Sequence, residues 1–225
     1  MSDKSILPDA YSKGKVLVGM SGGVDSCVAA LLLTQQGYQV TGATMDIGSE
    51  NSVRDVADAA QAAARLGIEH IAIDLKERFS ECVIDHFMKE YEAGRTPNPC
   101  VVCNKTIKMG ALMEKALELG FDFLATGHYA RVVRDTLSGK SELHKAGYLP
   151  KDQSYVLYSL TQERLSHLLL PLGELAKDEV RKIAADHSLV DPRRGESQDI
   201  CFIPEGDHAA YIADRKGCDP KAGIS

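Results

Sequence analysis

Alternation of short apolar runs with helical segments is the feature that most constrains the fold of this chain. A Val-rich run at 15–20 leads through a glycine turn into a helical pattern at 26–36, which ends before Gly37. Similar apolar runs return further along the chain and alternate with helical patterns. This order predicts an α/β fold in which a parallel sheet carries helices on both faces, with a short mixed C-terminal extension.

Periodicity and turn residues predict the remaining elements. Because ligands of such sheets bind beyond the carboxyl ends of the strands, the turn after Met20, the region after Met45 and the segment 127–129 are expected to share one crevice. We expect Ser52 to cap the helix that follows it. The expected elements are strands at 40–45, 68–74 and 121–126, helices at 53–66, 79–92, 106–119, 152–160 and 177–187, a hairpin of 129–135 with 141–146, and loops at 94–99 and 193–198.

Composition excludes several classes of protein. Hydrophobic residues make up 44% of the 225 residues and charged residues 26%, which is enough for a core and argues against disorder. The net charge of −6 argues against broad non-specific nucleic-acid binding. No apolar run reaches the roughly 18 residues of a membrane span, and the first residues lack a signal-like apolar stretch. We expect a cytoplasmic protein without a membrane partner, and the composition leaves its oligomeric state open.

The segment SGGVDS at 21–26 stands between the first strand and the first helix. Its glycines let the backbone approach a phosphate closely, and the helix N-terminus and the Ser hydroxyls offer donors. Asp25 beside phosphates suggests a bridging cation such as Mg²⁺. A tight turn with Asp25 and Ser26 as helix caps is the structural alternative. The segment is not a Walker loop, since no Gly-Lys-Ser/Thr follows.

Cysteines supply the second chemical signal. Cys100, Cys103 and Cys201 lie in or beside expected loops, whereas Cys27 and Cys82 lie in expected helices as small apolar residues. In a cytoplasmic protein we expect the loop cysteines to be reduced, metal-bound or catalytic. His128, after the strand at 121–126, faces the crevice as a hydrogen-bonding or acid-base group.

Five segments carry a family resemblance: GMSGGVDS, TPNPCVVCNK, ATGHYARV, KDQSYVLYSL and SQDICFI, in this order between residues 19 and 203. The first resembles the PP-loop of ATP pyrophosphatases, and together they resemble the bacterial tRNA-specific 2-thiouridylases (MnmA-type). The resemblance implies an ATP- and Mg²⁺-dependent tRNA-uridine 2-sulfurtransferase. Such enzymes attach AMP to the C2 oxygen of the wobble uridine of tRNA, release pyrophosphate, and replace the oxygen by sulfur.

The resemblance also implies roles for individual residues. Cys103 is implied as the nucleophile and Cys201 as the carrier of a persulfide received from a donor, either a persulfide carrier protein or inorganic sulfide. Asp25 is implied as part of the catalytic machinery. The implied ATP contacts are Gly19, Met20, Ser21, Gly22, Gly23, Val24, Asp25, Ser26, Met45 and Gly127, and the implied tRNA contacts are Asn98, Pro99, Cys100, Lys151, Asp152 and Gln153.

The chain departs from the family pattern at Cys100, where an acidic residue is common. Three thiolates, from Cys100, Cys103 and Cys201, are enough to hold a [4Fe-4S] cluster with one iron open to sulfide. A persulfide relay is the competing expectation, and a zinc site is a third that requires a further ligand.

Three regions are expected: an N-terminal arm at 1–14, a PP-loop ATP-binding catalytic domain at 15–150, and a tRNA-contacting helical region at 151–225 that carries Cys201. The family generally continues into a β-rich C-terminal region, which we expect this chain to lack. Two other functions stay open at this point. One is an ammonia-dependent PP-loop ligase for a small substrate, and the other is a non-catalytic module that binds a nucleotide or an iron-sulfur cluster.

Overall fold

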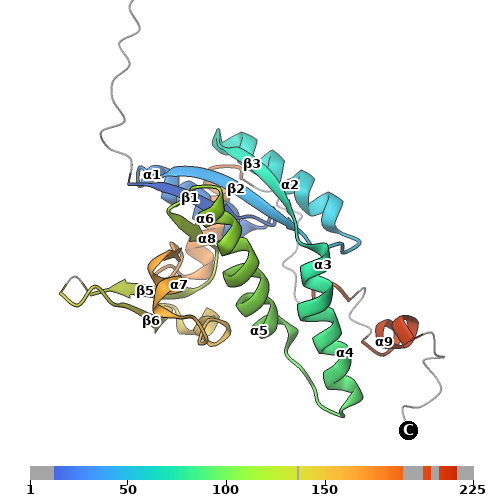
Figure 1. Ribbon diagram of the computed structural model, residues 1–225. Helices are drawn as coiled ribbons and strands as arrows, with labels where there is room; N and C mark the ends of the chain where they lie inside the picture. Colours follow the sequence, from blue (N-terminus) through green and yellow to red (C-terminus); the bar gives the residue numbers. More distant parts are fainter. Residues whose placement is uncertain (1–12, 136, 190–199, 204–207, 217–225) are drawn as a thin grey trace, which may run out of the picture.

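A parallel sheet of five strands forms the centre of the molecule, in the order β3-β2-β1-β4-β7 (Figure 1). The computed structural model describes residues 13–135, 137–189, 200–203 and 208–216, so residues 1–12 of the expected arm at 1–14 and the expected loop at 193–198 lie outside the described residues. The parallel sheet predicted from the sequence is confirmed. Its strands are β1 (Lys15–Gly19), β2 (Gln39–Asp46), β3 (Glu69–Asp74), β4 (Phe123–Ala125) and β7 (Leu168–Leu169).

The two faces of the sheet bury separate apolar cores. Val16 and Val18 of β1 point into the core under α1 (Val24–Gln35), α2 (Ser52–Leu66) and α8 (Lys177–Asp186). Leu17 points to the opposite face, where it packs with residues of η2 (Asn104–Leu112) and α6 (Met113–Glu118). All three β1 side chains are fully buried, as expected of a central strand covered on both faces.

Two long helical runs stand side by side and project away from the sheet (Figure 1). The first comprises α3 (Lys76–Phe79), η1 (Ser80–Ile84) and α4 (Asp85–Glu92), and the second comprises α5 (Pro99–Cys103), η2 and α6. Both η1 and η2 are π-helical. Phe79 and Phe87 of the first run form edge contacts with Phe202, and Phe202 also contacts Tyr211 of α9 (His208–Lys216). This aromatic cluster docks the segment 200–203 against the first helical run.

Three local predictions are wrong. Ser52 is the first residue of α2 and Asn51 is its N-cap. The helix expected from residue 106 begins seven residues earlier, at Pro99, so that Cys100 and Cys103 are helical, for reasons given below. The expected helix at 152–160 is replaced by a single 3-10 turn, η4 (Ser154–Val156), because Asp152 accepts hydrogen bonds from the Ala146 amide and the Ser154 hydroxyl, and such local bonds compete with a helix.

Residues beyond 150 contribute to the same layers, because β7 pairs with β4 and α8 packs on α1. The predicted hairpin is confirmed as β5 (Ala130–Arg134) and β6 (Ser141–Lys145). No helix within the described residues is long and apolar enough to cross a membrane. The remaining short elements are η3 (Leu149–Lys151) and α7 (Gln162–Ser166).

Candidate functional site

Two hydrogen bonds of the Ser26 hydroxyl hold the loop between β1 and α1 in its conformation. The Ser21 amide donates to Ser26 Oγ at 3.3 Å, and Ser26 Oγ donates to the Gly23 carbonyl at 3.1 Å. Gly22 has a φ of +69°, in the left-handed region that favours glycine. Gly23 is the N-cap of α1, and no side chain of the described residues caps it. Amides of the first turn are therefore left to bind an anion.

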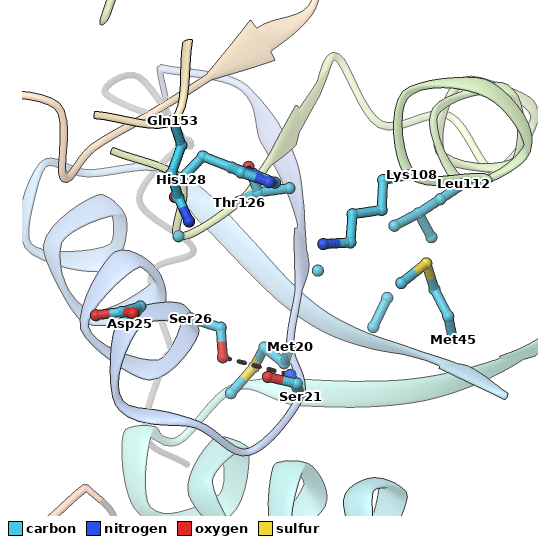
Figure 2. A pocket seen from close by; sticks show the side chains of 13 residues that line it. Met20, Ser21, Asp25, Ser26, Met45, Lys108, Leu112, Thr126, His128 and Gln153 are labelled. Atoms are coloured by element: carbon cyan, nitrogen blue, oxygen red, sulfur yellow. Dashed lines mark hydrogen bonds between the residues drawn. The ribbon is translucent and has the colours of Figure 1, made fainter. Parts of the chain in front are cut away.

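A cavity of about 200 Å³ opens above this loop (Figure 2). The three predicted loops do converge here, because the cavity is lined by residues after β1, at the end of β2 and after β4. One side is apolar, with Ala43, Met45 and Leu112, and the other is polar. This combination suits a nucleotide, with the base on the apolar side and the phosphates at the loop. The lining residues are Gly19, Met20, Ser21, Asp25, Ser26, Ala43, Met45, Lys108, Leu112, Thr126, Gly127, His128 and Gln153.

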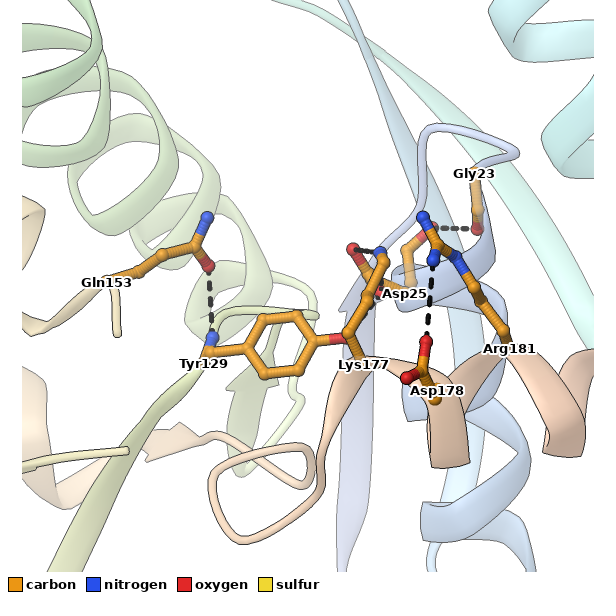
Figure 3. Close-up of polar contacts among 8 residues, drawn as sticks. Gly23, Asp25, Tyr129, Gln153, Lys177, Asp178 and Arg181 are labelled. Atoms are coloured by element: carbon orange, nitrogen blue, oxygen red, sulfur yellow. Dashed lines mark hydrogen bonds and ion pairs between the residues drawn. The ribbon is translucent and has the colours of Figure 1, made fainter. Parts of the chain in front are cut away.

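Asp25 lies at the centre of a polar network (Figure 3). Lys177 Nζ, from the first residue of α8, donates to both carboxylate oxygens of Asp25 at 2.7 and 2.8 Å. Tyr129 donates its hydroxyl to Asp25 at 2.8 Å, and Lys177 Nζ also lies 5.7 Å from the Tyr129 ring centre. Only 8% of the Lys177 side chain is exposed. The loop carboxylate is therefore oriented by two side chains that lie over 100 residues away in the sequence.

Gly127 is required by close packing. A Cβ atom at this position would lie 2.8 Å from the carbonyl carbon of Asp25 and 2.9 Å from the amide nitrogen of Ser26. Both are backbone atoms of the first turn of α1, so the loop after β4 can approach this turn so closely only because residue 127 is a glycine. This contact fixes the mouth of the cavity.

Cys100 and Cys103 lie in α5, a short helix that begins at Pro99, the last residue of the loop expected at 94–99. The Asn98 side chain caps α5, accepting from the amides of Cys100 at 3.1 Å and Val101 at 3.3 Å, and Pro99 occupies the first helical position. Proline is favoured there because its missing N–H is not needed. Cys100 is exposed and Cys103 is half-buried.

Cys201 and Cys103 lie near enough to influence each other electrostatically. Burial raises the pKa of the Cys103 thiol to about 11, Lys108 opposes this rise, and Cys201 and Cys100 add to it. Cys201 is exposed at the surface, yet the neighbouring chain partly desolvates its thiol and raises its pKa, again opposed by Lys108. The two cysteines are 98 residues apart in the sequence, and the docking of Phe202 brings them together.

His128 is buried and neutral. Burial and the nearby ammonium of Lys108 lower the pKa of His128 to about 3. A hydrogen bond of 2.7 Å joins its Nδ1 to Thr126 Oγ1. The imidazole lines the cavity as a neutral hydrogen-bonding group, in line with the simpler of the two roles expected for it.

The three residues implied as tRNA contacts at 151–153 differ in their environment. Lys151 is exposed, whereas the Asp152 carboxylate accepts from Ala146 and Ser154. Gln153 lines the cavity, and its side-chain oxygen accepts from the Tyr129 amide at 3.0 Å. Among the described residues, no group of three His, Cys, Asp or Glu side chains is arranged to hold a metal ion.

Sequence patterns gave no role to two lysines of the site, Lys108 in the cavity lining and Lys177 on the Asp25 carboxylate. Lys177 was assigned only to a helix, because no local pattern connects it to a loop 152 residues earlier. Lys108 was likewise expected only as part of a helix. Its position five residues after Cys103 did not by itself indicate a role in the site. Asn104, next to Cys103, is also buried, and its side-chain oxygen has no hydrogen-bond partner among the described residues.

The fold and the cavity define an α/β domain with a pocket suited to a nucleotide at the carboxyl ends of its strands, lined by a lysine that influences two thiols. The chain belongs to the family described as tRNA methyl transferase HUP domain, which matches residues 14–205. A crystal structure of the predicted subunit of tRNA methyltransferase from Methanocaldococcus jannaschii has the same fold, with a TM-score of 0.52, 21% identity, and coverage of 92% of this chain and 90% of that one.

Curated relatives are more similar in sequence. The tRNA-specific 2-thiouridylase MnmA of Carboxydothermus hydrogenoformans is 48% identical over 227 residues, covering 96% of this chain and 62% of the relative. That of Treponema denticola is 49% identical over 206 residues, covering 88% of this chain and 56% of the relative. The resemblance to the 2-thiouridylases is confirmed, and the chain spans about three fifths of the length of these relatives.

Proposed function

We propose that this chain catalyses the adenylation and sulfur-transfer steps of a tRNA-uridine 2-sulfurtransferase. The proposal rests on one observation, that the cavity suited to a nucleotide lies near the two cysteine thiols. The cavity beside the 21–26 loop is lined by Lys108, and the same lysine influences the thiols of Cys103 and Cys201. ATP-dependent activation and thiol chemistry can therefore act on one carbonyl group of the substrate, the first at its oxygen and the second at its carbon.

In the first step, ATP binds with its β- and γ-phosphates at the loop amides of 21–26. Gly127 permits the close approach of the two loops, and Met45 supplies an apolar contact for the adenosine. Mg²⁺ would neutralise phosphate charge, and Asp25 is the carboxylate in the cavity lining that would hold it, at the expense of a contact with Lys177 Nζ, which now lies on both of its oxygens. The C2 oxygen of the uridine attacks the α-phosphorus, the bond to the β-phosphate breaks, and pyrophosphate leaves.

In the second step, sulfur replaces the activated oxygen. The terminal sulfur of a persulfide on Cys201 attacks C2, and the oxygen leaves with AMP. The Cys103 thiolate then attacks the Cys201 sulfur, forming a Cys103–Cys201 disulfide and releasing 2-thiouridine. An external thiol reductant regenerates the two thiols, and a persulfide carrier protein or inorganic sulfide with an oxidant reloads Cys201.

The alternative with a [4Fe-4S] cluster on Cys100, Cys103 and Cys201 lacks support from the described geometry, in which these thiols are not arranged as a metal site. We therefore derive no step through a cluster. Iron and acid-labile sulfide analysis of anaerobically purified protein tests this choice. If the wild type holds about four irons per chain and Cys100→Ala loses both the iron and the activity, a mechanism with the cluster would take the place of the persulfide relay.

The tRNA substrate is proposed to approach along Asn98, Pro99 and Cys100 at the start of α5, with Lys151 as an exposed phosphate contact. We propose that the remainder of 151–225 also contacts tRNA. We further propose that the enzyme acts in the cytoplasm.

A two-part assay tests the function. Pyrophosphate release is measured with and without bulk tRNA, and digested tRNA is analysed by mass spectrometry for thiolated uridine. We expect tRNA-dependent release that is lost in Asp25→Ala, and thiolation lost in Cys103→Ala and Cys201→Ala. Cys82→Ala is the matched control, because Cys82 is a free thiol in the same helical layer. Full thiolation by Cys201→Ala would refute the mechanism.

The same assay separates the two other classes. An ammonia-dependent ligase would release pyrophosphate without tRNA and would tolerate loss of Cys103 and Cys201. A non-catalytic nucleotide-binding module would bind ATP and release no pyrophosphate.

A further inference from the structure

Lys108 is the cation that connects the two halves of the site. Figure 2 shows its side chain reaching into the cavity, with the ammonium group between His128 on one side and Met45 and Leu112 on the other. Within the described part of the chain, Lys108 forms no hydrogen bond or ion pair, although it lies among polar groups. A partly buried ammonium without a counter-ion is costly, so its position favours an anionic ligand.

The π-helical geometry of η2 explains why Lys108 can face the thiols. Lys108 follows Cys103 by five residues, which in an α-helix would separate the two side chains by about 140° around the axis. In η2, from Asn104 to Leu112, the backbone hydrogen bonds join residues five apart, so each residue turns the chain by less than in an α-helix and the angle between positions five apart is smaller. The local winding thus turns Lys108 toward both the cavity and Cys103.

The surroundings of the thiols contain few other charges. Cys103 is influenced by Lys108, Cys201 and Cys100, and Cys201 by Lys108, Cys100 and Asp55. His128 is neutral, because its pKa is about 3. Among the described residues, Lys108 is therefore the cation whose charge influences both thiols.

The proposed reaction develops negative charge twice at this place. During adenylation the α-phosphate must lie between the loop that binds the other phosphates and the uridine that approaches the thiols. During sulfur transfer the attacking sulfur is an anion, which a buried site disfavours without a nearby cation.

We propose, on the basis of the function above, that Lys108 is a catalytic residue whose ammonium group contacts the α-phosphate of ATP during adenylation and the sulfur anion during sulfur transfer. A single lysine then serves both steps in turn, because AMP leaves as sulfur arrives.

The test uses tRNA-free protein, so it is independent of the overall activity. ATP affinity is measured by isothermal titration calorimetry, and the rate of Cys103 alkylation by neutral iodoacetamide is measured at one fixed pH by peptide mass spectrometry. We expect Lys108→Met to weaken ATP binding about tenfold, as loss of a charged hydrogen bond does, and to slow alkylation roughly threefold to tenfold. Lys108→Arg should retain most of both.

Lys105→Met is the matched control, because Lys105 lies on the same helix and is exposed. Lys108→Gln provides a second neutral variant, and circular dichroism shows whether each variant is folded. If folded Lys108→Met or Lys108→Gln keeps either wild-type ATP affinity or wild-type Cys103 reactivity, the proposal is overturned. Absence of tRNA thiolation by the wild type would instead overturn the proposed function. The ATP affinity and the Cys103 alkylation rate would still test the role of Lys108 in that case.

Discussion

The ion pair of Lys177 with Asp25 gives a quantitative prediction about stability. Lys177 Nζ contacts both oxygens at 2.7 and 2.8 Å, with 8% of the Lys177 side chain and 34% of the Asp25 side chain exposed. Breaking a fully buried pair costs about 3 to 5 kcal/mol, because one charge is left without a partner. Water reaches Asp25, so Lys177→Met should cost less, about 1 to 2 kcal/mol.

Asp25→Asn should cost more, about 3 kcal/mol, because it leaves the more deeply buried ammonium without its carboxylate. The double variant Asp25→Asn/Lys177→Met should be less destabilised than the sum of the single variants, by about 1 to 2 kcal/mol. Urea unfolding followed by far-UV circular dichroism measures these differences, since the chain has no Trp to report by fluorescence. Lys182→Met, at an exposed position of the same helix, is the control. If the single effects add within about 0.5 kcal/mol, the ion pair does not couple the two residues and the reasoning is refuted.

Three further predictions follow from particular contacts. Gly127→Ala should weaken ATP binding at least about tenfold, because its Cβ would lie 2.8 Å from the backbone of Asp25; unchanged affinity in a calorimetric titration would contradict this. Phe202→Ala should abolish thiolation and spare pyrophosphate release, because Phe202 docks the segment that carries Cys201; equal loss of both activities would count against that role. Stability should fall as the pH drops below 6.5, since His128 takes up a proton at its ordinary pKa of 6.5 when unfolded but only at about 3 when folded. The slope should approach about 1.4 kcal/mol per pH unit for this group, and His128→Gln should flatten it, as urea unfolding across this pH range would reveal.

Sequence patterns predicted the part of the site whose residues are adjacent in the chain, around the 21–26 turn. The 15–20 strand, the SGGVDS turn and the following helix are adjacent, and strand ends of a parallel sheet share one edge, so the cavity could be located from the sequence. The start of a helix at Pro99 is not predicted from the sequence, because two prolines within 94–99 indicate a loop. The cap by Asn98 with proline at the first position reverses that interpretation.

The remaining features depend on contacts that no local pattern encodes. β7 has two residues and is a strand only because it pairs with β4. The segment at 152–160 has helical periodicity, but the hydrogen bonds of Asp152 and the bond from the Gln153 amide to the Tyr129 carbonyl hold it in turns. Lys177 reaches Asp25 through the packing of α8 on α1, which belongs to tertiary structure alone.

The separation of Asp25 and Lys177 in the sequence has a consequence for biosynthesis. The two residues are 152 positions apart, so a ribosome completes the 21–26 turn long before it adds the lysine that neutralises its carboxylate. A nascent chain held at any point between them has the anion-binding turn without its charge partner. Because such distant pairings form late and slowly, an arrested or prematurely released chain is expected to leave this turn unsupported and open to degradation.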